Sequence, residues 1–544
     1  MKRITTFLLA ATLCTGVQAQ TANYDVAPLP KTIKAVEKND YLLNAETRIV
    51  CTQPDGDLMR DALFLQEYIQ DLTGLCPAIL TGDKKEAKGN IWLVVDQKNV
   101  PAKEGYRISI SDKGVVISGQ TAAGIFYGIQ TLRKSLPIVK QKDSKAVVTL
   151  PGVTIDDEPR FGYRGMMLDC CRHFFSVEFV KRYIDMMALH GMNRFHWHLT
   201  EDQGWRMAID RYPLLTSVGA WRNQTVIGRN TGIYDGQRYG GFYTKKEMKE
   251  IVKYAADRYI TVIPEIDMPG HMLAALAAYP ELGCTGGPYQ VLQTWGVYAD
   301  ILCAGNEKVF QFVENVLDEV IDIFPSEYIH IGGDEAPRDR WKVCPKCQQR
   351  IKDEGITAGN GQSAEARLQG YFTKRVQKYL STKGKKIIGW DELLECNVDT
   401  TATIMSWRGA QPGAEAAKLN HDVIMAPNSF CYFDYYQTDK QWNEPQLIGG
   451  NVPIEKTYSL EPVAEDIPEG LQRHIIGVQA NLWTEYIGAE ELVEYQVLPR
   501  MAALAEVQWM EKGRRDFEAF KQRATHMRDI YHLYGWTVAP HLWQ

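Results

Sequence analysis

The sequence predicts an α/β protein built on a (β/α)8 TIM barrel, preceded by a small α+β domain and followed by a short helical tail. Two observations carry this prediction. Strand-like and helix-like segments alternate over about 350 residues after Arg160, with some eight strands. Polar residues recur just past the end of one strand after another, and the strand ends of a barrel share one face. We find no Gly-rich phosphate loop after the first strand, which disfavours an open doubly wound sheet.

We divide the 544 residues into an export signal, residues 1–19, an N-terminal α+β domain, 20–155, a (β/α)8 barrel, 156–510, and a helical tail, 511–544. Lys2 and Arg3 precede an apolar run at 7–13, and small residues end at Ala19, as in a secretory signal. The apolar run is too short to cross a membrane. We therefore expect an exported protein, periplasmic or secreted, without stable membrane insertion.

The first domain shows strand-like segments at 90–96 and at 106–118, where Asp112-Lys-Gly114 predicts a turn. Helix-like segments cover 58–72 and 121–136. Strands that pair around a few helices indicate a small α+β layer. We find no catalytic cluster in this part of the chain.

After residue 160, segments with the hydrophobic period of a strand alternate with segments that have the period of a helix. The predicted strands are 165–169, 193–199, 260–265, 328–331, 386–390, 403–407, 422–425 and 475–480. The predicted helices include 177–190, 245–258, 307–324 and 364–381, and the tail also has a helical, amphipathic pattern.

Acidic, basic and aromatic residues follow the predicted strands in order. Because strand ends meet at one face of a barrel, we expect these side chains to share a site. In chain order they are Asp169, Arg172 and His173, then Glu201 and Asp202, Asp267 and His271, Asp334 and Glu335, Trp390 to Glu392, Trp407 and Arg408, Tyr432 and Asp434, and Trp483 and Glu485.

The stretch Tyr328-Ile-His-Ile-Gly-Gly-Asp-Glu-Ala-Pro337 is the strongest functional signal. Adjacent residues of a strand point to opposite faces, but glycine adopts backbone angles that other residues avoid. Gly332 and Gly333 can therefore turn Asp334 and Glu335 toward one pocket. Two acids in one pocket do not ionise alike, so one carboxyl can stay protonated near neutral pH.

Composition and motifs narrow the function. The net charge of −6 and the absence of a basic run argue against nucleic-acid binding. Nothing resembles a serine elbow or a phosphate cradle. The acid pair, with Trp390, Trp407 and Trp483 as walls for a sugar ring, indicates glycoside hydrolysis.

The eleven cysteines are scattered through the chain. Cys344-Pro-Lys-Cys347 could be half of a zinc site, but no second Cys-x-x-Cys completes it. We expect a local disulfide or two free thiols there, and we predict neither a metal ion nor a cofactor.

Several motifs together resemble glycoside hydrolase family 20, the β-N-acetylhexosaminidases. The resemblance covers the barrel from about residue 160 to residue 510, and the first domain is also similar to the domain that precedes the barrel in that family. The motifs are His330-Ile-Gly-Gly-Asp-Glu335, Arg172-His-Phe-Phe175, His196-Trp-His-Leu-Thr-Glu-Asp-Gln-Gly-Trp205, Pro264-Glu-Ile-Asp-Met-Pro-Gly-His271, Gly389-Trp-Asp-Glu392, Ser406-Trp407, Tyr432-Phe-Asp434 and Leu482-Trp-Thr-Glu485.

The resemblance implies an exo-acting, retaining mechanism in which the substrate's own acetamido group is the nucleophile. Glu335 would be the general acid and then the general base. Asp334 would hold the acetamido nitrogen, and Tyr432 the acetamido oxygen. The implied product is terminal β-linked N-acetylglucosamine or N-acetylgalactosamine.

The resemblance implies that the remaining site residues bind the substrate or support the catalytic acids. Substrate would contact Trp390, Trp407, Trp483, Arg172, Asp434 and Glu485. Catalytic support would come from His271, Glu201 and Asp267. The family more often has Asp at position 201, so this chain keeps the charge there with a longer reach.

Two alternatives stay open. A metal-dependent barrel hydrolase is suggested by His196 and His198. An exported sugar-binding protein without catalysis is the other, although the intact Asp334-Glu335 pair argues against it. We expect a glycan with a terminal N-acetylhexosamine as the partner and no nucleic acid, and the sequence leaves the oligomeric state open.

Overall fold

The computed structural model describes residues 20–53, 56–82, 89–139, 146–359 and 361–544. The predicted export signal lies outside these residues. The described chain forms two compact units: Lys31–Asp157 with the residues before Val26, and Glu158–Gln544 with Val26–Pro30. Within the described residues, no helix combines the length and apolarity that a membrane crossing requires.

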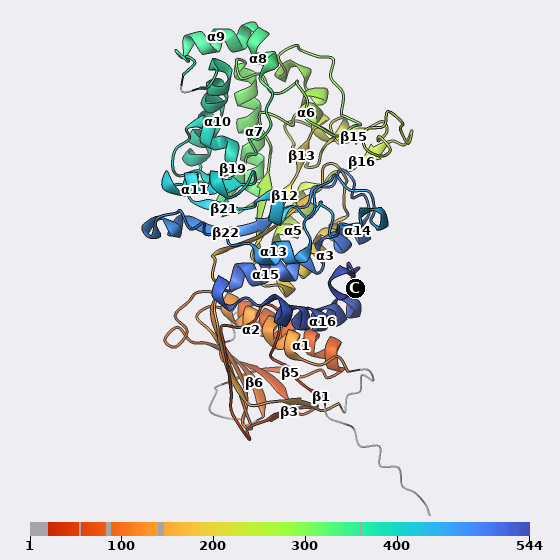
Figure 1. Ribbon diagram of the computed structural model, residues 1–544, viewed down its shortest axis with the longest axis vertical. Coiled ribbons are helices and arrows are strands. Elements are labelled where there is room, and N and C mark those ends of the chain that lie inside the picture. Colours follow the sequence, from red (N-terminus) through yellow and green to blue (C-terminus); the bar gives the residue numbers. More distant parts are fainter. Residues whose placement is uncertain (1–19, 54–55, 83–88, 140–145, 360) are drawn as a thin grey trace, which may run out of the picture. The chain divides into compact units, whose positions relative to one another are not determined.

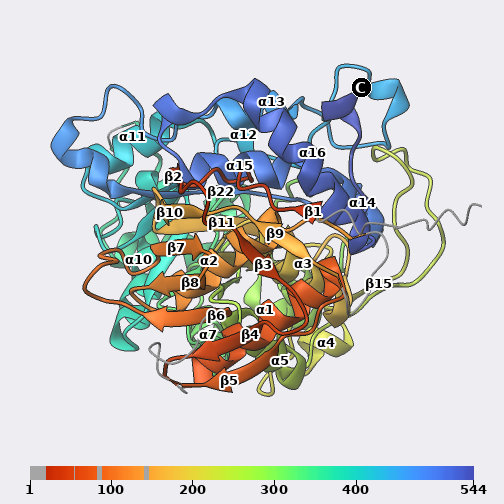
Figure 2. The same cartoon turned by 90° about the horizontal axis from the view of Figure 1, so that it is seen from below.

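The first unit is an α+β layer (Figures 1 and 2). Helices α1 (Gly56–Thr73) and α2 (Ala122–Ser135) pack against each other, and α2 contacts the central strands. Its seven-stranded sheet has the order β2 (Thr32–Ala35), β10 (Val153–Asp157), β7 (Tyr106–Ser111), β8 (Gly114–Gly119), β6 (Asn90–Val95), β4 (Arg48–Cys51), β5 (Ala78–Thr81). A second sheet has the order β1 (Gln20–Thr21), β9 (Val148–Leu150), β3 (Tyr41–Leu43).

The sequence predicted this unit well. Both helices and the strands at 90–96 and 106–118 are present, and the second of these runs turns at residues 112–113 into the β7–β8 hairpin. Alternating burial along β7 places its apolar side chains on one face. That pattern is the expected one for a strand with a single covered face.

The second unit is a closed barrel of eight strands, and every neighbouring pair is parallel (Figure 1). The predicted (β/α)8 fold is therefore confirmed, with small differences at strand ends. The strands are β11 (Tyr163–Asp169), β12 (Arg194–His198), β17 (Thr261–Glu265), β18 (Tyr328–His330), β19 (Lys386–Trp390), β20 (Thr403–Ser406), β21 (Val423–Met425) and β22 (Ile475–Ala480).

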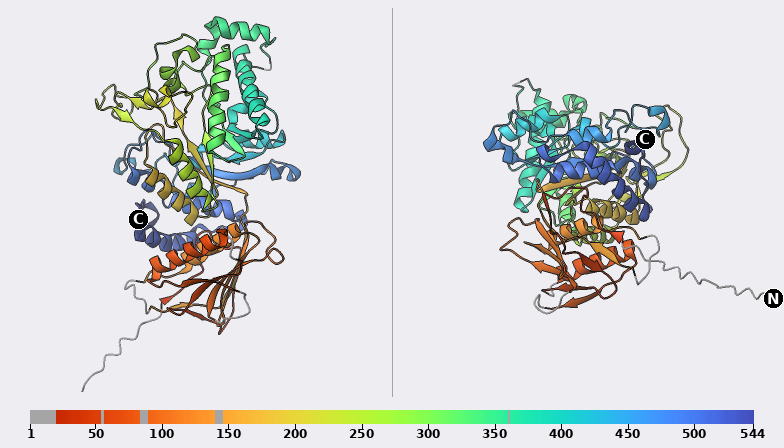
Figure 3. Two further views of the ribbon diagram at one scale, coloured as in Figure 1. Left: turned by 180° about the vertical axis from the view of Figure 1, so that it is seen from behind. Right: turned by 60° about the horizontal axis from the view of Figure 1, so that its bottom comes forward.

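Helices follow the strands, and several begin at a polar side chain that accepts a backbone N–H. Ser176, Asn306 and Ser363 cap α3, α7 and α10 in this way, and Thr244 with Glu247 forms a capping box on α5. Helices α7 and α10 lie side by side (Figures 1 and 3). The longer helices are α3 (Val177–Leu189), α5 (Lys245–Ala256), α7 (Glu307–Ile323), α10 (Ala364–Thr382), α11 (Ala410–Lys418), α14 (Glu490–Val497) and α15 (Arg500–Trp509).

Short elements occupy the connections between strands and helices. They include β13 (Thr200–Glu201), β14 (Gly204–Trp205), α4 (Leu214–Ser217), β15 (Trp221–Arg222), β16 (Tyr239–Gly240), α6 (Leu273–Ala278), η1 (Pro280–Leu282), α8 (Asp339–Val343), α9 (Pro345–Asp353), η2 (Asp391–Cys396), α12 (Asn428–Cys431), η3 (Gln441–Asn443), α13 (Ile454–Ser459) and η4 (Glu469–His474). The barrel interior itself is filled by side chains that include Tyr163, Ile263, Ile388, Trp390, Met405, Ile424 and Ala426.

The C-terminal helix α16 (Phe517–Leu533) lies between η5 (Lys512–Arg514) and η6 (His541–Trp543). It packs on the barrel helices, because Phe520 stacks on Tyr458 with ring centroids 4.8 Å apart. Arg523 binds the carboxylate of Glu506 on α15 through two contacts of 2.9 Å, and both side chains are almost fully buried.

This buried ion pair yields a stability prediction. Arg523→Met leaves the Glu506 carboxylate in the interior without its cation. Breaking a buried pair by removing one partner typically costs about 3–5 kcal/mol. We therefore expect a clear fall in the denaturant midpoint of the barrel transition, measured by tryptophan fluorescence.

Lys521→Met on the same helix is the matched control, since Lys521 pairs with Glu518 at the surface. Its effect should stay below about 0.5 kcal/mol. Equal midpoints for the two variants would show that the buried pair does not hold α16 on the barrel.

Candidate active site

A cavity of about 220 Å³ lies at the carboxyl ends of the barrel strands. It collects side chains at or just past the ends of all eight strands. Of the predicted catalytic, supporting and substrate-binding residues, only Asp267 is absent from the wall. The other expected strand-end residues that are absent from it are Asp169, His173, Asp202, Asp391, Glu392 and Arg408, and Tyr435 and Ile448 are additions. The lining residues are Arg172, Glu201, His271, Asp334, Glu335, Trp390, Trp407, Tyr432, Asp434, Tyr435, Ile448, Trp483 and Glu485.

The glycine hinge after β18 places the acid pair. Gly332 and Gly333 have φ of +63° and +99°, which is backbone that favours glycine. A Cβ at Gly332 would lie 1.8 Å from Oδ1 of Asp267, so the hinge and that carboxyl touch. The Gly333 N–H also donates to Asp267 Oδ1 at 3.1 Å. Asp267 therefore acts on the hinge from outside the cavity.

Glu335 lies beside His271. The Nε2 atom of His271 is 3.5 Å from Glu335 Oε2, and its Nδ1 atom is 2.7 Å from Glu201 Oε1. Burial alone would lower the pKa of His271, but the charge of Glu201 and the hydrogen bonds of its neighbours raise it well above the usual value. A protonated His271 in turn lowers the pKa of Glu335 through their hydrogen bond. The chain Glu201–His271–Glu335 thus holds a proton next to Glu335.

Asp334 presents an oxygen that awaits a donor. Within the described residues, its buried Oδ1 atom has no hydrogen-bond partner. Burial raises the pKa of Asp334, and burial together with the charge of Asp334 raises the pKa of Asp267 well above its usual value. The two neighbouring carboxyl groups therefore titrate as a pair.

Arg172 is a second basic residue of the cavity wall. Its guanidinium lies 3.1 Å from Asp169, 3.4 Å from Glu201 and 3.9 Å from Glu485. These carboxylates raise the pKa of Arg172 against the effect of burial. The guanidinium also lies over the Trp483 ring, 5.0 Å from its centroid.

Aromatic rings form the remaining wall. Trp390 is only 1% exposed, and its indole N–H donates to Glu265 at 3.0 Å. Trp407 stacks with Tyr432 at a centroid distance of 6.1 Å, and Trp483 lies 5.8 Å from Trp390. Burial raises the pKa of Tyr432 well above the usual value, so its phenol remains a donor.

Two more groups in the wall await polar partners. Oδ1 of Asp434 and Nε of Arg172 are buried and have no hydrogen-bond partner among the described residues. Burial raises the pKa of Asp434 well above its usual value, and it also raises the pKa of Glu485. A ligand that brings hydroxyl groups would satisfy these atoms.

His196 and His198, which suggested a metal site, lie in the buried core and not in the cavity wall. Both contact the carboxylate of Glu265: Nε2 of His196 lies 2.9 Å away, and Nδ1 of His198 forms a very short contact. His330 is fully buried and lies 3.0 Å from the same carboxylate. These histidines surround Glu265 beneath the Trp390 ring.

The sequence reading gave no role to three acids near the site. Asp202 lies 3.3 Å from His271 and accepts the Leu273 N–H. Glu392 accepts the Trp407 indole N–H at 3.0 Å, and burial with the charge of Asp334 raises its pKa to about 8. Glu265, described above, is the third. Asp202 and Glu392 were expected among the strand-end residues, whereas nothing local marked Glu265.

Asp391 directly follows strand β19. It is absent from the cavity wall, and its carboxylate accepts the backbone N–H groups of Trp407 and Arg408 at 2.9 and 3.1 Å. It therefore fixes the loop that carries Trp407.

Family models match nearly all of the described chain. The model "Glycosyl hydrolase family 20, catalytic domain" matches residues 161–512, and "Glycosyl hydrolase family 20, domain 2" matches residues 23–158. The chain is 44% identical over 538 residues to a beta-hexosaminidase of Porphyromonas gingivalis. That match covers 96% of this chain and 66% of the relative, so the chain spans about two thirds of the relative's length.

Solved structures give the same result. An exo beta-N-acetylglucosaminidase of Vibrio harveyi, in complex with N-acetylglucosamine, matches with a TM-score of 0.83 and 30% identity, covering 97% of this chain and 80% of that one. A beta-N-acetylhexosaminidase of Bacteroides fragilis matches with a TM-score of 0.78 and 32% identity, covering 95% and 97%. With the barrel, the acid pair and both family domains in place, the chain belongs to glycosyl hydrolase family 20.

Proposed function

We propose that this protein is a glycoside hydrolase, an exo-acting, retaining β-N-acetylhexosaminidase. It releases terminal β-linked N-acetylglucosamine or N-acetylgalactosamine from glycans, and the substrate's acetamido group supplies the nucleophile. The single observation that carries this proposal is the acid pair on one hinge, in which Asp334 keeps a buried oxygen without a partner while Glu335 adjoins His271.

The placement of the acids favours a nucleophile from the substrate. Retaining enzymes with two catalytic carboxylates place them about 5 Å apart on either side of the reacting carbon. Asp334 and Glu335 are consecutive residues, and each lies within 4 Å of the same atom, Nε2 of His271. They therefore approach a bound sugar from one side. An acetamido oxygen held below the anomeric carbon reacts intramolecularly, with a large effective molarity.

Each acid then has a separate task. Asp334 accepts the acetamido N–H through its free oxygen and stabilises the positive charge that develops as the oxygen attacks and the glycosidic bond breaks. Glu335 gives its proton to the leaving oxygen, and the product is an oxazoline-type intermediate. Glu335 then takes a proton from water, which opens that ring with net retention.

The proton for the first step belongs to the Glu335–His271 pair. In the empty site His271 carries it, because the pKa of His271 is raised and that of Glu335 is lowered. One proton shared by two adjacent groups titrates as a property of the pair. A leaving group next to Glu335 draws that proton to Glu335 for transfer. His271 and Glu201 are positioning residues in this scheme.

The size of the cavity supports exo action. At about 220 Å³ it is smaller than the roughly 300–1,000 Å³ pockets that hold drug-sized ligands. Trp390 closes the floor, with only 1% of its surface exposed. Such a cavity suits one sugar ring and its acetamido group. Arg172, Asp434 and Glu485 offer the donors and acceptors that ring hydroxyls need.

Neither alternative fits this geometry as well. A metal-dependent hydrolase would need His196 and His198 at the cavity, but both bind Glu265 in the core. A sugar-binding protein without catalysis would not need a proton held beside Glu335. We also propose that the protein is exported to the periplasm or secreted, since residues 1–19 have the charge and apolar pattern of a secretory signal.

The first prediction tests the acid. Glu335→Gln should fold normally and lose about 10²–10⁴-fold in kcat on a natural disaccharide, because an amide cannot donate the proton. The loss in the glycosylation step should shrink steadily across aryl glycosides with better leaving groups. Pre-steady-state kinetics over that series provides the measurement, and Glu491→Gln on the exposed start of α14 is the control. A loss that is independent of the leaving group would remove Glu335 from the role of acid.

The second prediction tests the nucleophile. Replacing the acetyl group by mono-, di- and trifluoroacetyl should slow turnover steeply, because fluorine withdraws electron density from the attacking oxygen. Asp334→Asn should cost about 10²–10³-fold in kcat with little change in folding. A flat rate across the fluorinated series, or a glycosyl adduct trapped on a carboxylate, would mean that the protein supplies the nucleophile.

The third prediction concerns pH. The Glu201 carboxylate favours the imidazolium form, so Glu201→Gln should lower the raised pKa of His271. The Glu335–His271 pair then loses its proton at a lower pH. The alkaline limb of the kcat/KM profile should therefore move toward acid by about one pH unit or more. An unchanged alkaline limb in a folded Glu201→Gln enzyme would exclude this electrostatic chain.

A further inference from the structure

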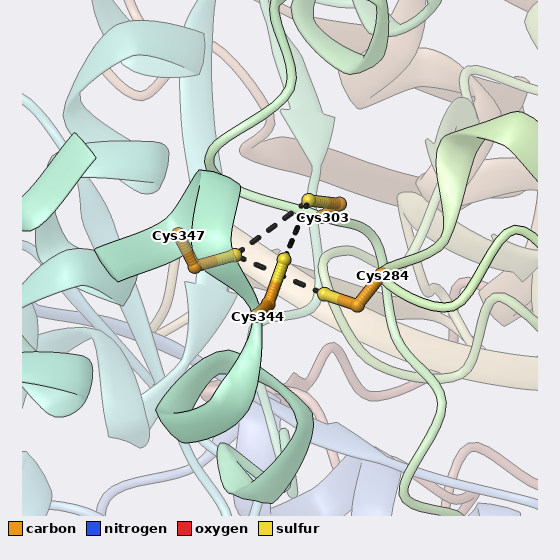
Figure 4. Close-up of side chains that lie close together, drawn as sticks. All are labelled: Cys284, Cys303, Cys344 and Cys347. Atoms are coloured by element: carbon orange, nitrogen blue, oxygen red, sulfur yellow. Dashed lines mark hydrogen bonds between the residues drawn. The ribbon is translucent and has the colours of Figure 1, made fainter. Parts of the chain in front are cut away.

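Four cysteines meet in the barrel unit although the sequence places them far apart. Cys284 follows η1, Cys303 lies just before α7, and Cys344 and Cys347 lie at the start of α9. Figure 4 shows their side chains pointing toward one another. All four sulfur atoms lie within 4.8 Å of one another, and three of the four side chains are buried. The sequence offered only the Cys344–Cys347 pair and no completing motif.

The sulfur separations match those of a tetrahedral metal–thiolate site. Zinc–sulfur bonds of about 2.3 Å place the sulfurs of a tetrahedron about 3.8 Å apart. The Sγ–Sγ distances are 3.8 Å for Cys284–Cys347, 3.7 Å for Cys303–Cys344 and 3.6 Å for Cys303–Cys347. A disulfide would require a separation of about 2.05 Å. The described cysteines are all free, so of the two expected states, a local disulfide or two free thiols, Cys344 and Cys347 have the second.

The backbone brings the four thiols together closely. Gly283 and Leu302 form an antiparallel bridge, which places Cys284 beside Cys303. A Cβ at Gly305 would lie 2.1 Å from the backbone carbon of Lys346, so only glycine permits this approach to the Cys344–Cys347 turn.

We propose that Cys284, Cys303, Cys344 and Cys347 form a structural zinc site. Four thiolates in a closed tetrahedron are a ligand set that selects zinc and leaves no open position for catalysis. Binding one Zn²⁺ requires four thiols to release their protons and involves no redox change. The resulting centre carries a formal charge of −2. Arg340, fixed by its two contacts with Asp300, lies close enough to Cys284 to interact with that charge.

The site joins the two loops that carry catalytic candidates. One is the connection from β17 to α7, which holds His271, and Leu302 in it donates its N–H to the Pro269 carbonyl at 3.0 Å. The other is the α8–α9 segment, which follows Glu335. Trp341 in α8 donates its indole N–H to the Leu302 carbonyl at 3.0 Å. Zinc would therefore clamp the segments on either side of the His271–Glu335 contact.

Metal content tests the proposal directly. The full chain, produced with zinc in the medium, should contain one zinc per chain by plasma mass spectrometry. Cys344→Ser/Cys347→Ser should lose that zinc. Cys76→Ser, an exposed cysteine in the other unit, is the matched control and should keep it. Cobalt-substituted protein should show the intense sulfur-to-cobalt bands of a tetrahedral thiolate site, and the double variant should not.

Thiol titration distinguishes the zinc site from the main alternative, which is two disulfides among the four cysteines. Unfolded protein, treated with chelator but no reductant, should show as many thiols as fully reduced protein. Four fewer thiols would mean two disulfides in place of zinc, and this would overturn the proposal. So would reduced protein that takes up no zinc, or a folded double variant that retains it. If the double variant does not fold, Cys284→Ser, whose side chain is partly exposed, should weaken zinc affinity at least tenfold. None of these readouts uses a substrate, so they are independent of the proposed function.

Discussion

The site depends on the backbone at Gly332 and Gly333, where β18 ends and both residues take positive φ. A continued strand would send Asp334 and Glu335 to opposite faces. The space that a side chain would need is already taken, at Gly332 by Asp267 and at Gly333 by a Leu393 methyl group 2.4 Å away. A larger residue at either glycine would therefore collide with its neighbours. The fold itself thus fixes where the Asp334 and Glu335 side chains point.

The charges in the cavity follow from that placement. Many carboxyl groups surround two described cations, Arg172 and His271. Burial opposes the ionisation of Glu201, but these two cations lower its pKa. At Asp434 burial and the charge of Glu485 outweigh the nearby cations, so the pKa of this carboxyl is raised well above its usual value. Protons thus distribute unequally among similar groups, which allows one acid to donate while another stays ionised.

Periodicity was sufficient to predict the barrel, because short apolar strands alternate with helices and several of these helices have a capping side chain. It also located most of the cavity wall, since strand ends share a face. Periodicity could not show which buried side chains contact each other. Glu265 with His196, and Cys284 with Cys347, are contacts between residues far apart in the chain, and no local pattern encodes them. The contact of Asp267 with Gly333 likewise crosses between strands.

Two residues of the proposed proton chain, His271 and Glu335, have strained backbone. His271 has φ of 53° and Glu335 has φ of 45°, and residues other than glycine rarely adopt this backbone region. Such residues persist only where the surrounding structure over-determines them. On one side the contact of Asp267 with the hinge supplies that constraint. On the other side, the loops that continue from His271 and Glu335 converge on the four cysteines. A metal centre there would hold both strained residues without entering the cavity, so the catalytic groups could stay close while the cavity keeps room for a sugar.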